Sequence, residues 1–396
     1  MLRLILGLGL FFFLWGGTTP ASVSAESLSS TQAYSEDGVM TDLATGLDLT
    51  EFEGFLDNLD QDVQASLPGF SLRQLFNDVK AGKLQLQPDQ LGRNILQLVA
   101  QEVAKSAPLI GKLLILAVLC AILQQLQVAY DGNVGKISQL LAYLVLFGLA
   151  LTSFQAAINI ATEAIDQMVG LMQALFPVML TLLVAMGNIT TAALFKPIIM
   201  GSLAFLGTLL KDIVLPLFFL AAVLRLFNQV SGQFKLTRLA GLLEFAGKVS
   251  LGLVLTLFIG IMTIQGVTGG VTDGVVLRTA KYSADLIPVV GRYFKDAVEL
   301  VASSGILLKN ALGIVAIIAL AVICLGPLVK LFAMILIFRI SAALVEPLGE
   351  QNLAESLQGM AQSLVYIFGV VASVTVMFFI TVAVIVGSGN LSVMLR

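Results

Sequence analysis

The chain has 396 residues, of which 58% are hydrophobic and 12% are charged, and its formal net charge is −3. Soluble domains contain roughly 45–50% apolar residues, so this composition predicts an all-α membrane protein that crosses the bilayer several times. Histidine is absent, which removes the commonest general base and metal ligand and argues against ordinary hydrolase chemistry. No basic cluster indicates nucleic-acid binding, and we expect neither a cofactor nor a metal.

Residues 1–25 follow the pattern of a signal peptide. Arg3 precedes an apolar run that ends at Trp15, and the small residues Val23-Ser24-Ala25 follow. The alternative, an uncleaved first span, is disfavoured because the run is shorter than the roughly 20 residues needed to cross a bilayer. We therefore predict that the mature chain begins at Glu26.

Residues 26–108 are expected to form a small exoplasmic region. Between Arg3 and Arg73 the chain has acidic residues but no basic residue, which is typical of an exported segment. Its first part, rich in Ser, Thr and Asp, resembles a flexible tether. Capping-box patterns at Thr50 and Ser71 and apolar residues at helical spacing then predict amphipathic helices.

Long apolar runs follow one another from residue 109 to near the C-terminus, and most are long enough to span a bilayer as helices. We divide them into a first transmembrane bundle over 109–268 and a C-terminal bundle over 306–396. Cys120 and Cys324 lie within such runs, where they are expected to pack as small buried hydrophobes. The runs cover roughly 109–129, 137–161, 168–187, 191–210, 213–227, 248–268, 306–326, 328–345 and 362–387.

The region 191–227 leaves two topologies open, because Lys211-Asp212 interrupts it and Pro197 and Pro216 flank the pair. A single helix would place both charges in mid-membrane, whereas a hairpin would place them at a short exoplasmic turn. The distribution of basic residues favours the hairpin, and with it nine crossings, the mature N-terminus outside and the C-terminus inside. The sequence is also compatible with seven or eight spans. The hairpin topology places Lys136, Lys196, Arg225, Lys235, Arg238, Lys248, Lys330 and Arg396 inside, and Glu346, Glu350 and Glu355 outside.

The stretch from Gly241 to Gly247-Lys248 is the nearest approach to a phosphate-binding loop. Five residues separate its glycines where the P-loop has four, and Val249 stands where Ser or Thr would bind magnesium. We expect these glycines to serve close helix packing instead.

The segment 269–305 is unusually charged for its place between two apolar runs. Burying its eight charges between residues 270 and 300 in lipid would cost on the order of 20 kcal/mol, so it is not a lipid-facing span. Pro288 removes a backbone donor and Gly291 loosens the next turn, which predicts a broken pair of amphipathic helices with a hinge there. The polar residues repeat at helical spacing and form one stripe, which consists of Arg278, Lys281, Asp285, Arg292, Lys295 and Glu299.

Two interpretations of this stripe remain open. It forms an interfacial connector with its polar side in water, or it lines an aqueous path or docks against a partner subunit. The second interpretation makes the stripe a functional site.

Here the sequence also resembles a known family, the stage III sporulation protein AE family of endospore-forming bacteria. The resemblance runs from the predicted signal peptide to the C-terminus and is most specific over 266–390. Residues 26–66 match the family in their acidic composition more than in their sequence. The segments that carry it are "LRTAK" (277–281), "IPVVGRYFKDAVEL" (287–300), "LLKNALGI" (307–314), "EPLGE" (346–350) and "MFFITVAVIVGSGN" (377–390).

The resemblance implies a non-enzymatic membrane subunit of a channel or secretion-like complex that joins mother cell and forespore. It implies a place in the outer forespore membrane, with the other stage III A-operon proteins and stage II sporulation protein Q as partners. The alternative is a secondary transporter with a midplane site near Lys211-Asp212, which should show two matching halves; only loose echoes are found. A third class, an enzyme acting on lipid or peptidoglycan, would need clustered acids or bases, whereas the carboxylates are scattered. The sequence is also compatible with a homo-oligomer.

Overall fold

The computed structural model describes residues 134–230, 236–284, 290–348 and 351–394, together with scattered positions between 54 and 122. Side chains are described mainly over 144–227, 236–266, 304–347 and 351–387. The signal peptide, nearly all of the exoplasmic region and most of the run 109–129 lie outside the described residues, so those expectations stay predictions.

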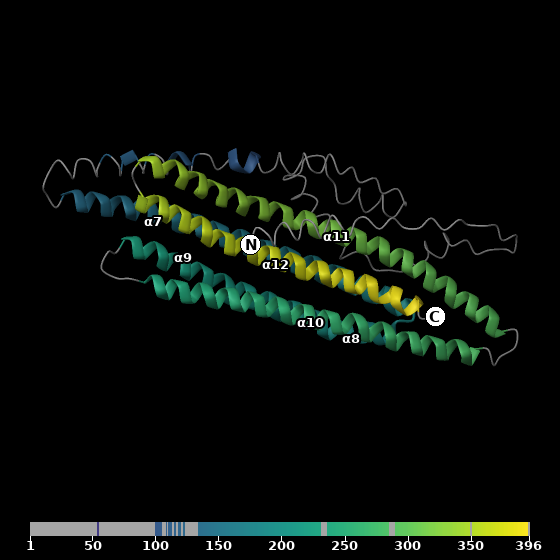
Figure 1. Ribbon diagram of the computed structural model, residues 1–396. Coiled ribbons are helices and arrows are strands. Elements are labelled where there is room, and N and C mark those ends of the chain that lie inside the picture. Colours follow the sequence, from purple (N-terminus) through teal and green to yellow (C-terminus); the bar gives the residue numbers. More distant parts are fainter. Residues whose placement is uncertain are drawn as a thin grey trace.

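The described chain is helical throughout and contains no strand, which confirms the all-α fold class. Its long helices run up and down in an elongated bundle. Helices α7, α10 and α12 run in one direction, and α11 and the continuous helix α8–η1–α9 run in the other (Figure 1). The chain reverses direction between α7 and α8, between α9 and α10, and between α11 and α12, and these three places are called the α7–α8, α9–α10 and α11–α12 turns (Figure 1). The elements are α7 (Val134–Ala185), α8 (Ile189–Leu209), the π-helical turn η1 (Leu210–Val214), α9 (Leu215–Val230), α10 (Thr237–Ala284), α11 (Val290–Val345), the 3₁₀ turn η2 (Glu346–Leu348) and α12 (Gln351–Met394).

The core lies along the axis of this bundle. The α11–α12 hairpin packs on α7 and α10, and α9 and α8 close the remaining side. Five described segments are long and apolar enough to cross a membrane, which makes the chain a multi-pass membrane protein. They are Leu144–Ala185, Ile189–Phe227, Thr237–Gly266, Ser304–Val345 and Leu353–Gly387.

The predicted hairpin at Lys211-Asp212 is wrong. Helix continues from Ile189 through η1 to Val230, and the two charged residues lie within the π-helical turn. The stretch 209–214 reads Leu-Leu-Lys-Asp-Ile-Val and offers no glycine, asparagine or proline to make a turn, so the backbone keeps its helical hydrogen bonds. Pro197 is accommodated inside α8.

The same correction applies to two other predicted breaks. The runs 137–161 and 168–187 form one helix, α7, and the runs 306–326 and 328–345 form one helix, α11, with Pro327 inside it. Eight of the nine apolar runs therefore fall in five membrane-spanning segments of the described chain, and the nine-crossing topology fails for this part.

This topology also reverses part of the expected charge distribution. The α9–α10 and α11–α12 turns lie at the same end of the bundle (Figure 1), so Arg238 and Glu346 share an end. They had been expected on opposite sides of the membrane. Lys196, near the start of α8, lies toward the other end, although it had been grouped with Arg238.

Two glycines let neighbouring helices approach closely. A Cβ atom on Gly313 of α11 would collide with the branched side chain of Val386 on α12. A Cβ atom on Gly247 of α10 would lie 2.7 Å from the ring of Phe218 on α9. Small residues at such crossings are the usual device of membrane helix packing.

Gly313→Ala should therefore destabilise the bundle, since the added methyl group meets a stiff β-branched side chain in a closely packed crossing. We expect a loss of about 1–3 kcal/mol, the usual cost of overpacking. Gly326→Ala is the matched control on the same helix, because nothing lies within 4 Å of its Cβ position. The measurement is thermal unfolding of the purified protein in detergent, and equal midpoints for the two variants would contradict the packing assignment.

Candidate functional site: a polar stripe on α7 and two ionic clusters

A stripe of polar side chains runs along the middle of α7, within an otherwise apolar helix. Each member lies three or four residues from at least one other member, which places them on neighbouring rows of one helix face. Gln155 Nε2 donates a hydrogen bond to Asn159 Oδ1 at 3.0 Å, so the stripe begins with a paired amide couple. The α7 stripe consists of Gln155, Asn159, Thr162, Glu163, Asp166 and Gln167.

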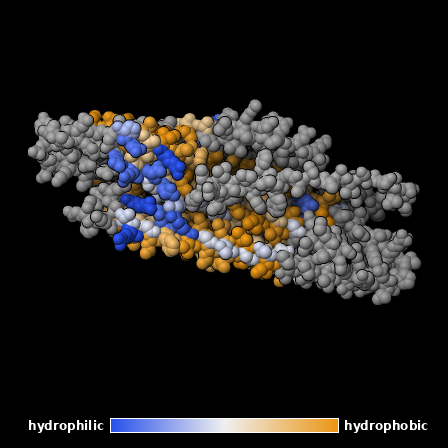
Figure 2. All heavy atoms as spheres, viewed as in Figure 1, coloured by the Kyte–Doolittle hydropathy of each residue, from blue (hydrophilic) through white to orange (hydrophobic). Residues whose placement is uncertain are grey.

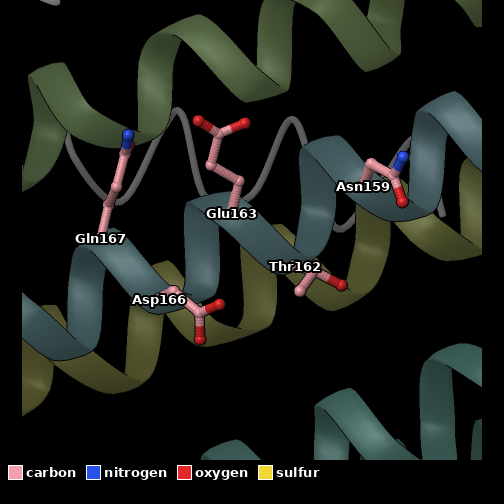
Figure 3. A pocket seen from close by; sticks show the side chains of 5 residues that line it. All are labelled: Asn159, Thr162, Glu163, Asp166 and Gln167. Atoms are coloured by element: carbon pink, nitrogen blue, oxygen red, sulfur yellow. The ribbon is translucent and has the colours of Figure 1, made fainter.

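Five of these residues, all but Gln155, line a shallow open groove with a volume of about 520 Å³. Figure 3 shows Glu163 and Gln167 pointing to one side of α7 and Asp166 pointing to the other. Glu163 and Asp166 are both exposed. The groove thus offers carboxylate and amide groups on the surface of a helix that otherwise suits lipid.

Asp166 forms an ion pair with Lys211 of η1. Lys211 Nζ lies 2.8 Å from Oδ1 and 2.7 Å from Oδ2, so it contacts both carboxylate oxygens. The side chains are 35% and 57% exposed for Lys211 and Asp166, and such a pair contributes only about 0–1 kcal/mol. Lys211 was predicted as an intramembrane or turn charge, and the structure gives it a partner on α7. Its neighbour Asp212 is exposed.

A second ionic cluster joins α9, α10 and α12 near the α9–α10 turn. Glu244 is 5% exposed, and its Oε2 lies 2.8 Å from the guanidinium of Arg225 and 3.7 Å from Lys248 Nζ. Lys248 Nζ also lies 4.4 Å from the centre of the Tyr366 ring, and that ring stacks on Phe218 with centroids 5.1 Å apart. One buried carboxylate therefore contacts two cations, one from α9 and one from α10.

This arrangement explains the stretch that loosely resembles a phosphate loop. Gly247 packs against Phe218, and Lys248 is engaged by Glu244 and Tyr366. The packing role expected for its glycines is confirmed at Gly247. At Gly241 no neighbour lies within 4 Å of a Cβ position.

Lys309 is the one described cation that is fully buried, at 0% exposure, and it is not among the site residues predicted from the sequence. Its Nζ donates a hydrogen bond to the main-chain carbonyl of Val386 at 2.6 Å, which links α11 to α12. A charge at this depth is tolerated where it faces protein rather than lipid.

The predicted stripe of the 269–305 segment is divided between two helices. Arg278 and Lys281 lie on the last turns of α10, and Gly291, Arg292, Lys295 and Glu299 lie on the first turns of α11. Asp285 and Pro288 fall outside the described residues, and so do the side chains of the others. The stripe and its hinge therefore stay predictions.

The comparisons with known proteins agree with one another. The family model for stage III sporulation protein AE matches residues 70–389. Stage III sporulation protein AE of Bacillus subtilis (strain 168) is 38% identical over 317 residues, which cover 80% of this chain and 79% of that protein. The chain belongs to the stage III sporulation protein AE family. No solved structure matches this member of the family.

The two ionic clusters should differ in their contribution to stability. Glu244→Ala leaves two cations facing each other around a buried cavity, and we expect a loss of about 1–3 kcal/mol. Asp166→Ala removes an exposed partner and should cost less than about 1 kcal/mol.

Chemical or thermal unfolding of the purified variants in detergent measures this difference. The ranking is the decisive outcome: a larger loss for Asp166→Ala would show that the bundle depends on the α7 pair rather than on the Glu244 cluster.

Proposed function

We propose that this protein is a non-enzymatic membrane subunit of a transenvelope channel or secretion-like complex that links mother cell and forespore. Its place is the outer forespore membrane. Its partners are the other stage III A-operon proteins and, across the intermembrane space, stage II sporulation protein Q. Family membership supports the sporulation role. The membrane and the partners are those that the resemblance implies, and the α7 stripe described below supports a place in a larger assembly.

The observation that carries the proposal is the α7 stripe. Polar and charged groups are expensive against lipid, so a helix that exposes Asn159, Glu163 and Asp166 requires water or a polar partner along that face. A subunit of a larger membrane assembly meets that requirement, since a neighbouring subunit or an aqueous path then lies along the stripe. A bundle surrounded by lipid along this face does not meet it.

A secondary transporter is the second candidate, favoured by the Lys211–Asp166 ion pair midway along α8–η1–α9. A transporter site there would depend on the pair itself rather than on the whole stripe. The exchange variant Lys211→Asp combined with Asp166→Lys keeps the pair and reverses it, and so discriminates the two hypotheses. A complex subunit should tolerate the exchange, whereas a substrate or ion site should not.

The stripe can be tested by making it apolar. We expect Asn159→Leu combined with Glu163→Leu to lower spore yield while the protein still accumulates in the membrane, because the substitutions remove the groups that face water or partner. Thr152→Leu combined with Gln173→Leu is the control, since both residues are exposed on α7 outside the groove. Spore counts and immunoblots of membranes are the measurements.

The same variants are then tested for co-isolation with the other stage III A-operon proteins and stage II sporulation protein Q. Full spore yield with the stripe removed, or failure of the unaltered protein to co-isolate with any of them, would reject the proposal.

The predicted 269–305 stripe has its own test. If it lines a path or docks against a partner, Arg292→Glu and Lys295→Glu should block sporulation without lowering the amount of protein. Val290→Glu and Phe294→Glu, on the predicted apolar side, should lower the amount of protein by disrupting packing. Normal spore yield after both reversals would leave the interfacial connector as the better interpretation, since exposed pairs contribute only about 0–1 kcal/mol.

A further inference from the structure

The helices of the bundle are too long for one bilayer. The segment Ile189–Phe227 has 39 residues, which corresponds to roughly 58 Å at 1.5 Å per residue. The hydrocarbon core is about 30 Å thick. Fitting this whole segment into it would require a tilt of about 60°, beyond the 0–40° at which membrane helices are found. Part of the bundle must therefore lie outside the hydrocarbon.

The contacts between helices define one level across the bundle. Asp166 of α7 meets Lys211 of η1, and two residues further along α7 the sulfur of Met168 lies 3.3 Å from Cys324 Sγ on α11 and 3.8 Å from Thr375 Oγ1 on α12. We call the part between this level and the α7–α8 turn the apolar half. The part between this level and the α9–α10 turn is the charged half.

The described charges are distributed very unequally between the two halves. Beyond those at the dividing level, the apolar half has two described charged side chains. Lys196 lies about 10 Å from the start of α8, within reach of an interface by snorkelling, and Lys309 is fully buried. The charged half contains Glu163, Arg225, Arg238, Glu244, Lys248, Lys330, Arg339, Glu346 and Glu355.

Two further features fit this division. The α7 stripe extends from the dividing level into the charged half, and Figure 2 shows hydrophilic residues gathered toward the end of the bundle where α9 meets α10. In the apolar half, Thr263 Oγ1 on the outer side of α10 donates to the carbonyl of Ile259 at 2.7 Å. Its hydroxyl therefore needs no water, and the surrounding surface suits acyl chains. The apolar half is roughly 30 Å long, counted from Ile189 to Lys211, which matches the hydrocarbon thickness.

We propose that only the apolar half is immersed in the bilayer, against lipid acyl chains, and that the charged half projects from the membrane, with the Asp166–Lys211 pair at the boundary. This places Lys211 and Asp212 at the membrane surface rather than at the midplane. Exposed apolar side chains of the charged half, such as Leu242 and Phe245, are then covered by protein or face water, but do not face lipid. The inference does not depend on the proposed function.

The bundle offers a matched pair of probes for this placement. Phe205 on α8 and Phe245 on α10 are the same residue type and are both 67% exposed. Phe205 lies in the apolar half, six residues from Lys211. Phe245 lies in the charged half beside Glu244, which pairs with Arg225 near the end of α9.

The experiment uses single tryptophan residues in the full chain. The sequence has one tryptophan, Trp15, so Trp15→Phe provides the background for Phe205→Trp and Phe245→Trp. Each purified variant is reconstituted into phosphatidylcholine vesicles with either brominated or ordinary acyl chains, because bromine quenches tryptophan fluorescence on contact. Unfolding midpoints confirm that both variants keep the fold. Ile264→Trp and Leu242→Trp, at positions 65% and 61% exposed, form a second pair if either phenylalanine variant is unstable.

We expect brominated lipid to quench most of the fluorescence of the Phe205→Trp variant and little of that of the Phe245→Trp variant. Equal quenching of the two would overturn the proposal, since it would place both halves in lipid. So would an unquenched Phe205→Trp variant. Neither result bears on spore formation, so failure here is distinct from failure of the proposed function.

Discussion

The continuity of helices that are at least twice as long as the hydrocarbon core of a bilayer is thick is the constraint on which the rest of this structure depends. An α-helix satisfies its own main-chain groups, which is what makes it stable in lipid. Prolines at 177, 197 and 327 sit inside these helices without ending them. Because the helices are continuous, the connections between them lie only at the two ends of the bundle. Residues far apart in the sequence, such as Asp166 and Lys211, therefore come into contact at a defined height along the bundle axis.

The polar contacts follow from that alignment. At one level Asp166 meets Lys211, and toward the α9–α10 turn Glu244 gathers Arg225 and Lys248, with Tyr366 and Phe218 completing the cluster. At the opposite end, Lys309 reaches across to the carbonyl of Val386 on α12. Apart from Glu244–Lys248, which lies within α10, each contact joins two different helices, so the polar groups reinforce a packing order that the apolar core establishes. The α7 stripe differs because it faces outward, and that makes it the described feature best suited to contact water or another subunit.

Composition and hydropathy were sufficient to predict a helical multi-pass membrane protein, and family motifs in the sequence pointed to the correct family. The number and ends of the spans could not be predicted in the same way. Lys211-Asp212 was predicted to be a turn because the local sequence does not show that Asp166, on another helix, pairs with Lys211. Residues 162–167 looked like a loop between two spans, although the helical spacing of Gln155, Asn159, Thr162 and Asp166 could have identified a stripe on a continuous helix. Lys309 and most of the Glu244 cluster depend on contacts between different helices, which no local sequence pattern indicates.

The central claim is that the α9–α10 and α11–α12 turns lie at the same end of one continuous bundle. The most direct measurement is the distance between spin labels at Leu239 and Leu344, two exposed positions beside those turns, in the purified full-length protein in lipid. Our account predicts a distance set by the width of the bundle, well below the length of its longer helices, which is roughly 65–85 Å for 44–56 residues. A distance equal to the bilayer thickness or greater, with the two labels accessible from opposite sides of the membrane, would contradict it.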